Sequence, residues 1–127
     1  MGNLESPTIA EKAIDRARRG VLAPQALLWT LAASKVVVPT PDGDFSGDPR
    51  TFVPLLIGRD SMQFLVVFTR PVLIGSYASR APQFIEMLGG DIVTGMPPGV
   101  GIVINPGTDE GFELPPDGVA AFRDELA

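Results

Sequence analysis

Two residue types that carry much of enzyme chemistry are missing from this chain of 127 residues, which contains no cysteine and no histidine. Without cysteine there can be no disulfide, no thiol nucleophile and no thiolate metal site. Without histidine the chain lacks the commonest general acid–base group and the commonest metal ligand. We therefore expect that the protein is not an enzyme and that it uses no metal and no cofactor.

Lysine is also scarce, occurring only at positions 12 and 35, and the 15 acidic residues outnumber the 10 lysines and arginines to give a net charge of −5. Nucleic-acid binding depends on clustered lysine and arginine, so we expect no nucleic-acid partner. No apolar run approaches the roughly 18 residues that a membrane span needs, and the first residues lack the pattern of a secretory signal. These absences predict a cytoplasmic protein that does not contact membranes.

The length fits one domain covering residues 1–127, which is long enough to bury a single apolar core. We expect flexible segments at residues 1–6 and 40–50. The second segment imitates a calcium loop, because residues with oxygen-bearing side chains and one glycine take positions 1, 3, 5, 6 and 7 of such a loop. These residues are Asp42, Asp44, Ser46, Gly47 and Asp48. Position 12 is Val53 where the loop needs a bidentate glutamate, so we predict no calcium site.

Helix signals occur at four places in the sequence. A capping box formed by Thr8 and Glu11 predicts a helix over 7–19 that ends before Gly20 and that buries Ile9 on its apolar stripe. Prolines that suit a first turn predict further helices from residues 24, 82 and 115–116 onward, the second of them stopping at 89–90. A helical turn is expected over 72–80.

Short apolar runs bounded by turn residues predict strands over 35–39, 51–57, 62–69, 91–94, 100–104 and 112–114. The run at 100–104 is rich in β-branched residues, which favours a position in the middle of a sheet. Pro54 favours an edge or a bulge for its own strand. Together these elements predict an α+β fold, an α/β sandwich in which helices pack on a mixed sheet of about five to six strands.

The turn after the strand at 100–104 is the best candidate for a site. Its composition is that of a turn whose backbone amides can hold an anion, although it can equally be a simple reversal between two strands. The residues that end the strand at 62–69 join it in the candidate binding surface. This surface comprises Thr69, Arg70, Asn105, Pro106, Gly107 and Thr108.

Four segments resemble the SseB N-terminal domain family. They are residues 52–56 (FVPLL), 65–70 (LVVFTR), 101–107 (GIVINPG) and 112–115 (FELP), and the similarity runs from Leu27 to the C-terminus. The resemblance implies a small bacterial α/β domain of undefined biochemical role, and it brings no catalytic residues.

The composition and the resemblance together favour a non-enzymatic protein-interaction or regulatory module that uses a sheet edge or an apolar groove. Its partner would be an unknown protein or a second copy of the chain. The alternative is a sensor of a small ligand or anion that uses the turn Asn105–Thr108.

Overall fold

The computed structural model describes residues 8–41, 54–79, 83–108 and 111–127. Within these residues, four α-helices, one 3₁₀ segment and six strands build an α+β fold, as the sequence predicts. The predicted flexibility of residues 1–6, and of most of the segment 40–50 with its calcium-like spacing, falls outside the described residues.

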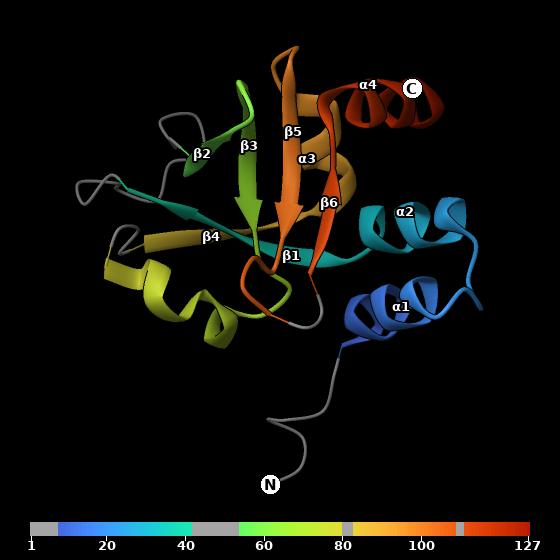
Figure 1. The fold of residues 1–127 in the computed structure, drawn as a ribbon, viewed down its shortest axis with the longest axis horizontal. Coiled ribbons are helices and arrows are strands. Elements are labelled where there is room, and N and C mark those ends of the chain that lie inside the picture. The colour runs from blue at the N-terminus through green and yellow to red at the C-terminus, as the bar shows by residue number, and fades with distance from the viewer. Residues whose placement is uncertain (1–7, 42–53, 80–82, 109–110) are drawn as a thin grey trace, which may run out of the picture.

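Four strands form the larger sheet, in the order β2-β3-β5-β6. They are β2 (Leu56–Arg59), β3 (Met62–Val67), β5 (Val100–Ile104) and β6 (Phe112–Leu114). Because β3 and β5 run parallel while the outer pairs run antiparallel, the sheet is mixed. All five residues of β5 are buried, and the strand lies between β3 and β6, which confirms its predicted central position (Figure 1).

The remaining strands, β1 (Lys35–Thr40) and β4 (Gln83–Leu88), form a separate antiparallel pair. The expectation of one sheet is therefore corrected to two. The two sheets touch through a single bridge, in which Val37 and Phe68 exchange backbone hydrogen bonds of 2.7 and 2.8 Å. One bridge is too little for a continuous ladder, and β1 and β4 run across the direction of β3 and β5 (Figure 1).

The predicted helix from residue 82 and the predicted strand at 91–94 are both wrong. Residues 83–88 form β4, and the glycines expected to stop a helix instead begin α3 (Gly89–Gly95). The spacing of Phe84, Ile85 and Leu88 suits a helix, but alternate residues of this segment are exposed, as in a strand with one covered face. Close packing explains the glycines, because a Cβ at Gly89 would lie 2.2 Å from the carbonyl oxygen of Leu31.

The other helices lie where the sequence places them, as α1 (Ile9–Arg18), α2 (Pro24–Ala32) and α4 (Pro116–Leu126). The capping box of α1 is present, and Gly20 follows the helix with φ of 78°. One correction concerns the face of α1: Ile9 is 74% exposed, whereas Glu11 is buried beside Ala10, Ala13 and Ile14. The buried face therefore carries a carboxylate.

Two apolar clusters lie against the larger sheet. The first joins the sheet to the α-helices through residues such as Ile14, Leu27, Ile102 and Phe122. The second joins Phe64, Phe68 and Val103 to Ile74 of the 3₁₀ segment η3 (Pro71–Ser79), which confirms the helical turn expected over 72–80 as far as Ser79. The strands expected over 51–57 and 62–69 are shorter, since β2 begins at Leu56 and β3 ends at Val67, and residues 51–53 lie outside the description. β2 is an edge strand, although Pro54 precedes it.

Candidate functional site

A buried polar network lies where β3 and β5 end. Asn105 directly follows β5 with φ of 51°, and its backbone N–H donates to the Val67 carbonyl at 2.8 Å. The Asn105 side chain meets Thr69 twice: Oδ1 accepts from the Thr69 backbone N–H at 2.9 Å, and Nδ2 donates to Thr69 Oγ1 at 2.9 Å. Asn105 is fully buried and Thr69 nearly so, so these bonds replace water contacts that both residues have lost.

The network continues into helix α1 through Glu11, whose carboxylate is 1% exposed. Thr69 Oγ1 donates to Glu11 Oε2 at 2.5 Å, and Arg70 Nε donates to the same oxygen at 2.8 Å. Glu11 Oε1 accepts from the Thr8 backbone N–H at 3.2 Å. A buried carboxylate is costly unless it is paired and hydrogen-bonded, and here it has one cation and two further donors. We call these residues, Glu11, Thr69, Arg70 and Asn105, the Glu11 network.

The structure thus divides the candidate binding surface into two parts. Thr69, Arg70 and Asn105 come together, but as members of the Glu11 network, and the side chains of Thr69 and Asn105 are covered. Pro106, Gly107 and Thr108 lie on the surface, where they border a depression of about 490 Å³ opposite η3. The described residues that line this depression carry no charge: Leu73, Ile74, Gly75, Tyr77, Pro106, Gly107 and Thr108.

Within the turn, Thr108 bonds to Asn105. The backbone N–H and the hydroxyl of Thr108 both donate to the Asn105 carbonyl, at 3.2 and 2.9 Å. Gly107 takes φ of 80°, which a glycine adopts without strain. This geometry fits a strand reversal, and an anion would find no cationic side chain among the described residues of the depression.

A second hollow, which we call the β4 groove, lies between the two sheets and has a volume of about 400 Å³. It is lined by apolar side chains and a single acid: Val38, Pro54, Leu56, Leu65, Met87, Asp91, Ile92, Gly95, Met96, Pro97 and Val100. Arg123 from α4 fixes one wall, because its guanidinium donates to the carbonyls of Val93 and Met96 at 3.1 and 2.8 Å. The groove can therefore bind apolar groups, and Arg123 holds one of its walls in place.

β4 contributes Met87 to this groove and β1 contributes Val38, so the groove lies on one face of the two-stranded sheet. Among the described strands β4 pairs only with β1, so its outer edge is not part of any described ladder. Met87 points to the groove side of the strand. On the opposite side, Phe84 and Leu88 are 42% and 43% exposed.

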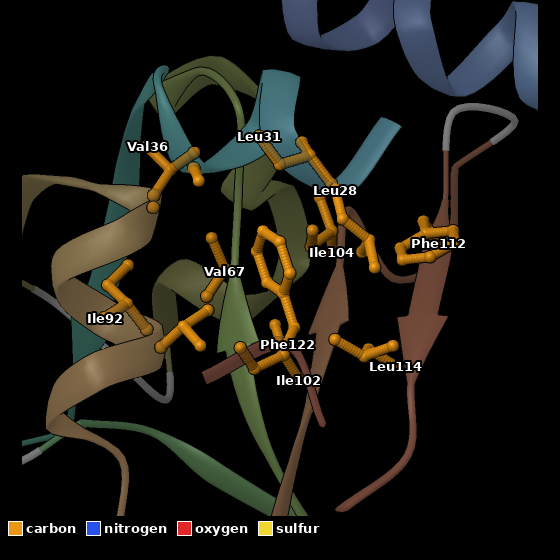
Figure 2. A pocket seen from close by; sticks show the side chains of 13 residues that line it. Leu28, Leu31, Val36, Val67, Ile92, Ile102, Ile104, Phe112, Leu114 and Phe122 are labelled. Carbon is orange, nitrogen blue, oxygen red and sulfur yellow. The ribbon is translucent and has the colours of Figure 1, made fainter. Parts of the chain in front are cut away.

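A third, small pocket reaches into the apolar core between the larger sheet and helices α2, α3 and α4 (Figure 2). Figure 2 shows Phe122 pointing into it among Val67, Ile102 and Ile104. Its volume is about 40 Å³ and all of its described lining residues are apolar. A space of this size without polar partners stays dry, so we interpret it as a packing defect.

Sequence reasoning missed Glu11 as a buried group, although a signal was present. Glu11 lies between Ala10 and Ala13–Ile14 on the buried face, but the capping-box pattern predicts only the bond between its side chain and the helix backbone. An acid on an apolar helix face predicts a buried partner, which here is Arg70.

The model of the SseB protein N-terminal domain matches residues 11–121. The chain belongs to this family. The match confirms the resemblance, and it covers the Glu11 network, both surface hollows and β4. No curated protein and no solved structure matches this SseB domain. Its described residues contain no group of acids placed to hold a metal ion and no helix with the length and apolarity of a membrane span.

Proposed function

We propose that this SseB domain is a peptide-binding module, in which an extended segment of a partner protein pairs with the outer edge of β4. The observation that carries the proposal is that β4 presents a six-residue edge beside an apolar groove. We propose a binding role and not a catalytic one because the chain lacks cysteine and histidine and because Glu11 is committed to its three donors.

The backbone supplies the first part of the interaction. An edge strand presents outward N–H and C=O groups that can form a ladder with an added strand. The other edges of the described structure are shorter or already bonded. β2 has four residues and β6 has three, while the outer edge of β1, which also has six residues, is hydrogen-bonded to Phe68 and Leu55. β4 therefore offers the longest template.

Side chains supply the second part. In an added strand, the residue opposite Met87 points to the groove side, because side chains opposite each other share a face. There it meets Met87 and Met96, whose flexible thioethers adapt to different apolar groups. Residues pointing the other way would cover Phe84 and Leu88, which are otherwise large apolar side chains left exposed on an edge strand.

The test is selection from a random peptide library on the purified domain, followed by calorimetry with the selected peptides. Leu56 lines the groove and is 39% exposed, so Leu56→Ser should leave the fold intact while weakening binding about tenfold, or ~1.4 kcal/mol. Val72→Ser is the matched control, because Val72 is 72% exposed and is not a groove residue. A library that yields no binder, or binders indifferent to Leu56→Ser, contradicts the proposal.

The depression beside Pro106–Thr108 supports a second candidate function, the binding of a small ligand. Because its described lining is uncharged, it favours a neutral ligand over the anion considered from sequence. Thermal-shift screening distinguishes the two: neutral fragments should raise the melting temperature, and inorganic phosphate should not. Stabilisation by phosphate alone would refute the preference for a neutral ligand.

A further inference from the structure

The side of β4 that faces away from the groove carries one charge between two apolar side chains. Phe84, Glu86 and Leu88 share this side, and all three are exposed. The partner of Glu86 on β1 is Val37, which is 2% exposed and uncharged. Lys35 pairs with Leu88, so it lies diagonally from Glu86 and on the β1 side. Directly across the outer edge, the position opposite Glu86 is vacant among the described strands.

The groove has the same sign of charge. Asp91 is the single ionisable residue among its described lining residues, and it follows β4 closely at the start of α3. A segment lying along β4 would thus meet one carboxylate on its outer side and another near the groove. Both favour positive charge in the segment, and its other side chains would contact apolar groups.

The same glutamate disfavours pairing with a second copy of the chain. In the two-fold antiparallel register that places Phe84 opposite Leu88, Glu86 lies opposite the Glu86 of the other copy. Like charges directly opposite each other destabilise a strand pair. A charge in the middle of an apolar edge strand is a device by which natural proteins limit edge-to-edge association.

We propose that β4 selects an extended segment in which a lysine or arginine stands opposite Glu86 with apolar residues on either side, and that Glu86 prevents self-pairing at this edge. This inference rests on the proposed function and specifies the chemistry of the partner. The basic residue pairs with Glu86. The residues two positions away on either side cover Phe84 and Leu88, and the residues next to it point to the groove.

The test uses short peptides with blocked ends and alternating valine and threonine that differ only at the central position, which is lysine, glutamine or glutamate. With the unmodified domain we expect affinity to fall in that order, with lysine about tenfold above glutamate. Glu86→Lys should reverse the order, and Glu86→Gln should remove most of the preference. Asp91→Asn measures the contribution of the groove and should reduce the preference without reversing it.

The outcomes separate this inference from the proposed function. If none of the peptides binds, both fail. If all bind equally and Leu56→Ser weakens them, the groove binds peptides and selection by charge is refuted. A lysine preference that persists in Glu86→Lys refutes the assignment to Glu86. Sedimentation tests whether Glu86 prevents self-pairing. Glu86→Leu should raise the dimer fraction at a concentration where the unmodified domain is monomeric. If the unmodified domain already dimerises through β4, this part of the inference is overturned.

Discussion

The hydroxyl of Thr69 is the most informative atom to remove, because it joins two strands to a helix. It donates to Glu11 Oε2 and accepts from Asn105 Nδ2, and Thr69 is 7% exposed. Thr69→Val keeps the shape of the side chain but deletes both bonds. Thr69→Ser keeps the hydroxyl and removes only a methyl group, so it is the matched control.

The magnitude follows from the two bonds. A hydrogen bond to a charged group contributes about 1.5–3 kcal/mol, and a neutral one about 1 kcal/mol. Thr69→Val should therefore lower the free energy of unfolding by about 3 kcal/mol, a large share of the roughly 5–15 kcal/mol typical of a domain. Thr69→Ser should cost about 1 kcal/mol, the transfer and cavity cost of one methyl group.

Urea unfolding followed by circular dichroism measures both variants. The midpoint should shift while the slope stays constant, because the fold and the surface exposed on unfolding are unchanged. The reasoning is refuted if Thr69→Val unfolds within about 0.5 kcal/mol of the unmodified domain, the usual size of a neutral surface substitution. It is also refuted if Thr69→Ser is as damaging as Thr69→Val, since the hydroxyl would then not be the cause.

Three further predictions use the same urea assay. Gly89→Ala should lower the free energy of unfolding by more than about 2 kcal/mol, because its Cβ would collide with the Leu31 carbonyl. In the same helix, a Cβ at Gly95 meets no atom within 4 Å, so Gly95→Ala should raise the free energy of unfolding by up to ~1 kcal/mol. Equal effects would contradict the packing explanation. Val36→Ile should raise the free energy of unfolding by about 0.8 kcal/mol, because its extra methyl group fills the small pocket in the core. A lower free energy of unfolding would show that the pocket cannot accept a methyl group. Ser61→Gly should raise the free energy of unfolding by about 0.5–1 kcal/mol, because Ser61 has φ of 66° in the turn between β2 and β3. An unchanged free energy of unfolding would mean that contacts of the serine side chain offset the backbone strain.

The sequence predicted best the elements whose local signals agree with their surroundings. Val100–Ile104 is β-branched and buried, and Thr8–Glu11 forms the expected capping box, so local preference and tertiary context coincide there. The prediction for the segment 83–95 is wrong because its local signals are ambiguous: the apolar residues of β4 fit either period, and Gly89 matches the pattern of a helix stop. Only the approach of α2 explains why that glycine is needed.

The candidate site was predicted as a set of residues but not as an arrangement. Thr69 and Asn105 were expected at a surface because their strands were expected to end there. Both are buried, and Thr69 bonds to Glu11, which lies 58 residues before it in the chain. No local pattern specifies a contact at that separation, although an acid on an apolar face indicates that some partner exists.

The two sequence segments that carry the most specific part of the family resemblance meet inside this network. Thr69 and Arg70 belong to the segment 65–70, Asn105 belongs to the segment 101–107, and the two segments are joined by the hydrogen bonds of the Asn105 side chain. These residues hold α1 against the ends of β3 and β5, and hydrogen bonds that are already made within the fold are not available to a ligand. The resemblance in these segments is therefore accounted for by the architecture. For this reason we place the proposed binding role on surfaces that the network leaves open, and among the described residues β4 with its groove is the surface that supports it best.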